Sequence, residues 1–141
     1  MAIRFDGKVA IVTGAGGGLG RCHALELAKR GAKVVVNDLG GALDGTGGNS
    51  EAAEKVVAEI KAAGGEAFPN GASVSDDAGV AHLVKQAMDA YGRIDVLIAN
   101  AGILRDKSFG KMELADFQAV MAVHLMGTVK PAKAMWDIMK K

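Results

Sequence analysis

The residues best suited to bind a ligand are the glycines of one short segment near the amino terminus, TGAGGGLG from Thr13 to Gly20. Gly14, Gly18 and Gly20 carry no Cβ atom, so the backbone can turn tightly here and come close to an anionic group. An apolar run precedes the segment and a helical pattern follows it, and the free N–H groups at the start of a helix attract negative charge. The segment therefore predicts a site for the pyrophosphate of a dinucleotide. A glycine-rich turn that binds nothing is the alternative.

One acidic residue supports the dinucleotide interpretation. Asp38 follows a second apolar run and lies eighteen residues after Gly20, close to where a carboxylate accepts hydrogen bonds from the ribose hydroxyls of adenosine. A negative charge there repels the 2′-phosphate of NADP, and neither Asn37, Leu39 nor the glycine-rich segment after them supplies an Arg or Lys to neutralise it. We therefore expect NAD as the cofactor. A polar residue that merely ends a strand is the alternative.

These residues must be positioned by strands and helices, and the spacing of the apolar residues predicts both. Strands are expected at residues 8–13, 33–37, 66–72 and 95–99, the last covered on both faces. Helices are expected at residues 18–30, 50–63, 76–91 and 113–141, and a glycine-rich loop at 39–49. Pro131 should kink or interrupt the last helix because it lacks a backbone N–H. This alternation predicts an α/β fold with a doubly wound, parallel, Rossmann-like sheet, in one dinucleotide-binding domain over residues 1–141.

Composition and charge narrow the range of functions. The chain has 141 residues, half of them apolar, which suits one domain with a real core. With a net charge of +1 and no basic patch, no nucleic-acid partner is expected, and no segment resembles a membrane span. The three histidines stand apart from other metal-binding residues, so no metal site is predicted.

The single cysteine, Cys22, excludes an internal disulfide framework. A chain without a disulfide framework and without a signal-peptide pattern fits a reducing compartment, so we expect the cytoplasm. Cys22 itself is expected to be a small buried side chain rather than a reactive thiol.

Three motifs, in the same order, resemble the classical short-chain dehydrogenase/reductase family. They are TGAGGGLG, Asp38 at the end of the second strand, and ANAG at 99–102, where the family usually has NNAG. More narrowly, RFDGKVAIVTGAGGGLGR and NAGILRDKSFGKM look like the (3R)-hydroxyacyl-CoA dehydrogenase unit of the peroxisomal multifunctional enzymes and their bacterial relatives.

The resemblance implies a role for each matching position. The cofactor-binding positions that it implies are Gly14, Gly18, Leu19 and Gly20 around the pyrophosphate, Asp38 at the ribose, Ser73 and Val74 at the adenine, and Asn100 and Gly102 along the cofactor site. Ser73 replaces the Asp usual in the family and would give a weaker contact. From the residues alone, Asn100 could equally be a buried amide that satisfies backbone groups at the strand end.

One residue falls at a position that the family uses in catalysis. His124, in VHLMG, stands where most members have an asparagine of the catalytic network, and the hydroxyacyl-CoA subfamily tends to have histidine there. The family's catalytic serine and its Tyr-x-x-x-Lys have no counterpart up to Lys141. Tyr91 precedes the fourth strand and has no lysine four positions later. The resemblance thus implies a domain that is incomplete at its carboxyl terminus, truncated before strand five, with the catalytic residues outside it.

Three functions remain open at this point. The first is NAD-dependent oxidation of a 3-hydroxyacyl-CoA or a similar secondary alcohol to the ketone, with this chain as the cofactor-binding part. The second is a stand-alone module that binds NAD or an adenine nucleotide without catalysis, and the third is a piece of a longer enzyme. The resemblance also implies that the chain forms a homo-oligomer through its last helix. The apolar residues that would form core or interface there include Met121, Met126, Met135, Trp136 and Met139.

Overall fold

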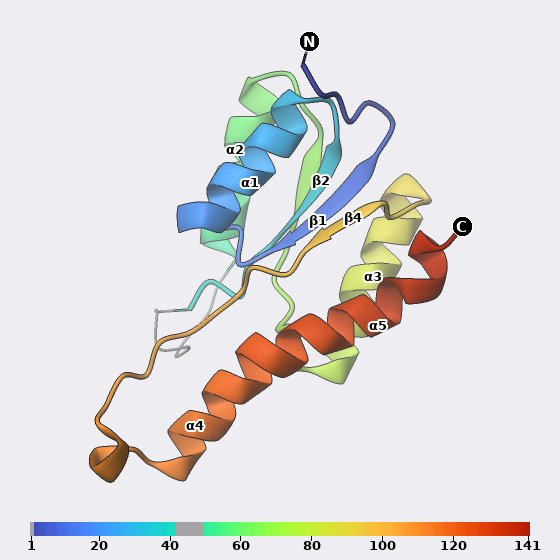
Figure 1. The fold of residues 1–141 in the computed structure, drawn as a ribbon. Helices are drawn as coiled ribbons and strands as arrows, with labels where there is room; N and C mark the ends of the chain where they lie inside the picture. Colours follow the sequence, from blue (N-terminus) through green and yellow to red (C-terminus); the bar gives the residue numbers. More distant parts are fainter. Residues whose placement is uncertain (1, 42–49) are drawn as a thin grey trace.

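The computed structural model describes residues 2–41 and 50–141, and in them strands and helices alternate as expected (Figure 1). The elements in order are β1 (Val9–Thr13), α1 (Gly18–Lys29), β2 (Lys33–Asn37), α2 (Glu51–Ala62), β3 (Ala67–Asn70), α3 (Asp77–Tyr91), β4 (Val96–Ile98), a short 3-10 helix (Phe109–Lys111), α4 (Leu114–Met121), a π-helical turn (Ala122–Met126) and α5 (Gly127–Met139). Most of the predicted loop at 39–49 lies outside the described residues.

The four strands form one parallel sheet in the order β3-β2-β1-β4, which confirms the predicted doubly wound topology. Val12 of β1 stands between Val36 of β2 and Ile98 of β4. The chain moves outward from β1 to β2 and β3, and then returns to the other side of β1 for β4. The direction of winding therefore reverses between β1 and β4, and the carboxyl ends of such a strand pair border the crevice in which α/β sheets bind ligands.

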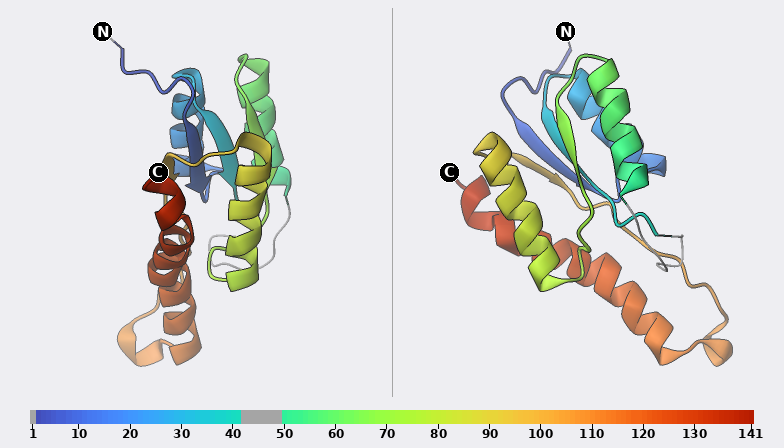
Figure 2. Two further views of the ribbon diagram at one scale, coloured as in Figure 1. Left: turned by 90° about the vertical axis from the view of Figure 1, so that its right-hand side faces the viewer. Right: turned by 180° about the vertical axis from the view of Figure 1, so that it is seen from behind.

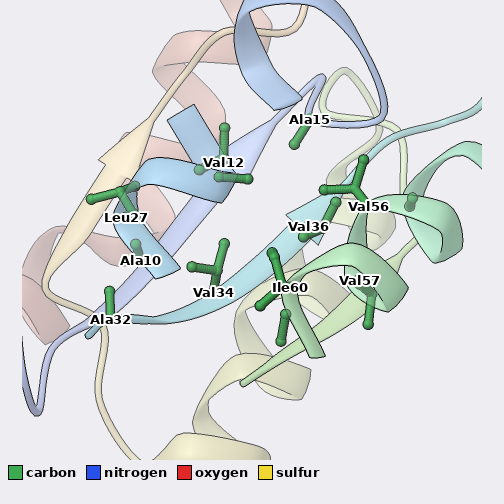
Figure 3. Packing of buried hydrophobic residues seen from close by; sticks show 13 residues of the cluster. Ala10, Val12, Ala15, Leu27, Ala32, Val34, Val36, Val56, Val57 and Ile60 are labelled. Carbon is green, nitrogen blue, oxygen red and sulfur yellow. The ribbon is translucent and has the colours of Figure 1, made fainter. Parts of the chain in front are cut away.

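Helices cover both faces of the sheet, and the alternation of side chains along each strand decides which face each residue supports (Figures 1 and 2). Ala10 and Val12 point toward α1 and α2, where Leu27, Val56 and Ile60 meet them (Figure 3). The next residues along these strands face the opposite side of the sheet, where Ile11 and Val35 pack with Leu83 of α3 and Met135 of α5.

Two expectations about burial need correction. The faces of β4 contact both core clusters, yet its residues are only half-buried, because within the described residues β4 pairs only with β1. Cys22 is exposed and not buried. The buried face of α1 contains Gly20, Ala24 and Leu27, and a residue two positions from Gly20 lies about 200° around the helix, away from the sheet.

The last helix is present, but its irregularity is not at the proline. The sequence predicts a kink or interruption at Pro131, whereas α5 continues through this buried residue, and the π-helical turn Ala122–Met126 precedes it. Figure 1 shows α4 and α5 as one continuous rod. Pro131 removes only the N–H that would bond to the carbonyl of Gly127, the first residue of α5, so its effect is confined to the first turn of that helix.

This rod buries one side and exposes the other. Met135 is fully buried against α3, while Met126 and Met139 are exposed. Further large apolar side chains, between 39% and 72% exposed, follow each other along the rod; they are Leu114, Phe117, Met121, Leu125, Val129 and Trp136, here called the α4–α5 stripe.

Candidate cofactor-binding site

The glycine turn, residues 13–20, packs tightly on its inner side. A Cβ atom on Gly20 would lie 2.2 Å from the carbonyl oxygen of Gly14 and 2.5 Å from Nδ2 of Asn100. Gly14 has a φ of +63°, and a Cβ atom there would come within 2.8 Å of Cα of Ala101. Only glycine allows α1 and the end of β4 to approach the turn this closely.

The outer side of the same turn is open. A Cβ atom on Gly17 or Gly18 would meet nothing within 4 Å. Gly17 is the N-cap of α1, no side chain caps this helix, and its first turn holds no acidic residue. The start of α1, with no side-chain cap and with the positive end of the helix dipole, thus lies beside open space, which suits the pyrophosphate of a dinucleotide.

Asp38 is held beside the turn by two backbone N–H groups. Its Oδ2 accepts a hydrogen bond from Gly16 at 2.8 Å, and its Oδ1 accepts one from Gly40 at 2.6 Å. A carboxylate offers about four acceptor positions, so the two oxygens can still accept bonds from ribose hydroxyls. Gly16, which the sequence reasoning did not single out, is essential for this contact, because a Cβ atom there would lie 2.7 Å from Oδ2 of Asp38.

Asn100 joins the ends of β1 and β4. Its Nδ2 donates to the carbonyl oxygens of Thr13 and Gly14, each at 3.2 Å. In return, Oγ1 of the buried Thr13 accepts from the N–H groups of Asn100 and Ala101, each at 3.0 Å. Asn100 therefore satisfies backbone groups at the strand ends, as one of its two interpretations requires, but it is half-buried and not buried. Its contact with a cofactor stays a prediction.

The loop after β3 carries the two residues assigned to the adenine. Oγ of Ser73 lies 2.9 Å from Oγ of Ser75, and Val74 is buried against α5. A Cβ atom on Gly127 would come within 2.6 Å of Cγ2 of Val74, so this glycine lets the helix approach the loop. Ser73 thus presents a hydroxyl already engaged by a neighbour, and Val74 an apolar surface.

His124 lies in the π-helical turn and fixes the loop that follows β4. Its Nε2 is 3.0 Å from the backbone nitrogen of Ile103 and 2.8 Å from the carbonyl oxygen of the same residue. One tautomer accepts from the N–H, and the other donates to the carbonyl. Gly102 supports the ring closely, since a Cβ atom there would lie 2.6 Å from Cε1 of His124. Single π-helical turns often occur at functional sites.

A cavity of about 720 Å³ at the carboxyl ends of the strands brings most of these residues together. The predicted site residues that line it are Gly14, Gly18, Asp38, Ser73, Val74, Asn100 and Gly102. Leu19 is exposed beside it and Gly20 lies behind the turn, so neither belongs to its lining, and their contact with pyrophosphate stays a prediction. Arg105, which sequence reasoning missed, also lines it and forms an ion pair with Asp116 at 3.2 Å.

Another hollow, of about 520 Å³, is lined at the opposite ends of the strands by Lys33 and Glu66. It contains neither the glycine turn nor Asp38. Tyr91 is also distant from the site residues: it ends α3 and packs on Phe68 with a ring-centroid distance of 5.3 Å. Burial raises the pKa of Tyr91, whereas an acid–base tyrosine needs a lowered pKa.

Among residues 2–41 and 50–141, no three His, Cys, Asp or Glu side chains come together as a metal ion would require. None of the helices in this part of the chain combines the length and apolar character needed to cross a bilayer.

The sequence matches the family model described as short chain dehydrogenase over residues 8–141. The chain belongs to the short-chain dehydrogenase family. Two solved members have the same fold: a short chain dehydrogenase from Mycobacterium avium (TM-score 0.85, 48% identity, 94% of this chain and 46% of that one) and a hydroxysteroid dehydrogenase from Escherichia coli (TM-score 0.87, 34% identity, 97% and 54%). Membership in a family of Rossmann-fold dehydrogenases implies a nicotinamide nucleotide as cofactor.

The curated relatives of this short-chain dehydrogenase chain include much longer enzymes. It is 57% identical over 141 residues to peroxisomal multifunctional enzyme A of Dictyostelium discoideum, covering 100% of this chain and 31% of that protein. It is 55% identical over 139 residues to peroxisomal multifunctional enzyme type 2 of Mus musculus, covering 99% and 18%. The chain therefore spans less than a third of the length of either relative. Both names include the peroxisome, and the cytoplasmic location expected from the sequence stays a prediction.

Proposed function

We propose that this short-chain dehydrogenase chain is the cofactor-binding part of an NAD-dependent enzyme that oxidises a 3-hydroxyacyl-CoA, or a similar secondary alcohol, to the ketone. The choice of NAD rests on the carboxylate of Asp38, which the N–H groups of Gly16 and Gly40 hold at the edge of the cavity. The substrate class is supported by the similarity to the multifunctional enzymes over the whole of this chain.

Different residues of the chain bind different parts of the cofactor. The first turn of α1 offers uncapped N–H groups to the pyrophosphate, and Asp38 accepts hydrogen bonds from the ribose hydroxyls of adenosine. Asn100 and Thr13 hold the two strand ends together beneath the cavity, and His124 holds the loop that begins at Gly102. When bound, the nicotinamide ring would accept a hydride from the substrate carbon.

The proton transfer is assigned to residues of the whole enzyme outside this chain. In the family, a tyrosine acts as acid and base, a lysine lowers its pKa, and a serine orients the carbonyl. The only tyrosine of the chain, Tyr91, has a raised pKa and packs on Phe68 away from the cavity, which supports this assignment.

An activity comparison tests the proposal. The whole protein, given short-, medium- and long-chain 3-hydroxyacyl-CoA with NAD, should form NADH, detected by its absorbance. Residues 1–141 alone should bind ADP-ribose weakly and form no NADH. Turnover by residues 1–141 would refute the placement of the catalytic residues, and a whole protein that binds NAD but oxidises none of these substrates would favour the binding module.

We further propose that the α4–α5 stripe contacts a second copy of the chain. Each large apolar side chain that becomes buried contributes about 1.5–3 kcal/mol, so a few of them suffice for association. We expect light scattering to show a dimer or a larger assembly. Phe117→Glu should shift the protein toward monomer, whereas Gln118→Glu, which adds the same charge at the next position, should shift it less. A wild type that is monodisperse and monomeric at high concentration would contradict the assignment.

A further inference from the structure

A pair of buried amides lies at the cavity, which Asn37 lines and Asn70 does not. Asn37 at the end of β2 is 1% exposed and Asn70 at the end of β3 is 3% exposed. Nδ2 of Asn37 donates to Oδ1 of Asn70 and to the carbonyl oxygen of Ala72, each at 2.9 Å. Both N–H bonds of the Asn37 amide are therefore engaged, and buried amides that are hydrogen-bonded in this way specify one arrangement of the backbone around them.

Asn70 connects this pair to the body of the fold. Its Nδ2 donates to Oε1 of Gln86 on α3 at 2.7 Å, and its Oδ1 accepts the N–H of Ala72 at 2.9 Å. Its backbone carbonyl accepts the N–H of Asp38 at 3.0 Å. A single residue thus contacts α3, the loop after β3 and the residue proposed to bind ribose.

The segments that the pair holds are two parts of the cavity wall. Asp38 directly follows Asn37 in the chain, and Ala72 begins the run of residues 72–75 that lines the same cavity. The Asn37 side chain holds the carbonyl of Ala72 and the Asn70 side chain holds its N–H. The spacing between the ribose acceptor and the residues assigned to adenine therefore depends on these two amides.

We propose that Asn37 and Asn70 are positioning residues for the adenosine half of the dinucleotide. Their buried amide pair fixes the separation between Asp38 and the loop at residues 72–75. This inference rests on the proposed function, because it takes the cavity to be the dinucleotide site.

Two matched substitutions separate positioning from burial. Asn70→Asp keeps the oxygen that Asn37 and Ala72 use, and Gln86 can rotate its amide to present an N–H to the new oxygen. Asn37→Asp places an oxygen against the backbone carbonyl of Ala72, which has no N–H to offer instead. Both changes introduce a carboxylate of the same size at an almost fully buried site, but Asn37 lines the cavity and Asn70 does not. The uncharged Asn37→Ala therefore separates the loss of hydrogen bonds from the charge that Asn37→Asp places beside the ligand.

The dissociation constant of ADP-ribose, measured by titration calorimetry on the whole protein, is the main readout. Asn37→Asp should raise it at least about tenfold, while Asn70→Asp should raise it less than about threefold. Asn37→Ala removes the same two hydrogen bonds without a charge and should also raise it, whether or not Asn37→Asp folds. Equal effects of the two Asp variants, or an unchanged constant in Asn37→Ala, would overturn the inference.

A merely structural role has a different signature. Loss of stability alone lowers the melting temperature and the fraction of molecules that bind, and it leaves the dissociation constant of the folded molecules unchanged. Ile60→Val supplies this control, since Ile60 is buried in the α1/α2 cluster and does not line the cavity.

Hydrogen exchange of the Ala72 amide tests the positioning role of the two asparagines without a ligand, and therefore independently of the proposed function. Failure of the wild type to bind ADP-ribose would remove the proposed function. The Ala72 amide of the unliganded protein should still be protected in the wild type and in Asn70→Asp, and exchange faster in Asn37→Asp and Asn37→Ala. Equal protection in all four proteins would show that the pair does not position the loop.

Discussion

Gly20→Ala is expected to lower the free energy of unfolding by about 3 kcal/mol and to remove detectable NAD binding, because overpacking at a rigid site forces the backbone to move. The added methyl group would lie 2.2 Å from the carbonyl oxygen of Gly14 and 2.5 Å from Nδ2 of Asn100. Both groups are held in place by the junction between β1 and β4. Relief of the collision would move α1 away from the turn. Urea denaturation and titration calorimetry measure the two effects.

Gly17→Ala is the matched control for this prediction. Gly17 has an extended backbone with φ of −170°, and a Cβ atom there meets nothing within 4 Å. Its free energy of unfolding should fall by no more than about 1 kcal/mol, the loss expected when Ala replaces Gly at a helix N-cap. NAD binding should nevertheless weaken, because the methyl group enters the open side proposed for the pyrophosphate. Identical unfolding midpoints for Gly20→Ala and Gly17→Ala would contradict the distinction between the two sides of the turn.

Asp38→Ala should reduce NAD affinity by about 1–3 kcal/mol, or about 5- to 150-fold, because the ribose hydroxyls lose a charged acceptor. The affinity for NADP should fall less or rise, since the repulsion of the 2′-phosphate is removed together with the acceptor. Calorimetric titration of both nucleotides against wild type and variant measures the change in preference.

Asp38→Asn is the companion variant. It removes the charge and keeps one oxygen that can accept from Gly16, so the glycine turn should retain its geometry, while the bond from the N–H of Gly40 is lost. It should relax the preference against NADP with a smaller loss of NAD affinity than Asp38→Ala. Wild-type protein that binds NADP as tightly as NAD would refute the role given to Asp38.

The fold could be predicted from local sequence patterns because each pattern is compatible with only one kind of secondary structure and burial. Apolar runs such as Val34 to Val36 must be buried on both faces, and the helical periods between them supply the cover. The position of the cavity was also predictable. Gly14 and Asn100 follow the neighbouring strands β1 and β4, between which the direction of winding reverses.

Within the glycine turn, the separate roles of neighbouring glycines could not be predicted. Gly16, Gly17 and Gly18 are identical in type and adjacent in sequence. Only their contacts show that Gly16 is confined by Asp38 while the other two face open space. Similarly, the polar residue Asn70 in a short edge strand gives no sign that its partner is Asn37, because the pairing depends on the register between β2 and β3.

The π-helical turn escaped prediction for a different reason. Its residues, Ala122–Met126, have the apolar spacing of an ordinary helix, and Pro131 is the more conspicuous signal. The contacts of His124 with Ile103 and Gly102, which occur at this turn, join segments far apart in the chain and leave no local pattern.

The same π-helical turn constrains which insertions and deletions the gene can tolerate. Each residue added to or removed from a helix rotates everything after it by about 100°. The π-helical turn holds one residue more than a turn of α-helix, so a one-codon deletion between Ala122 and Met126 would convert it to ordinary helix and leave Met135 facing α3. The same deletion between Gly127 and Met135 would rotate the residues after it and carry Met135 out of the core. Changes of length should therefore be excluded from α5 up to Met135, and be tolerated by its packing within the π-helical turn and in segments that precede α4, such as the loop that carries the 3-10 helix Phe109–Lys111.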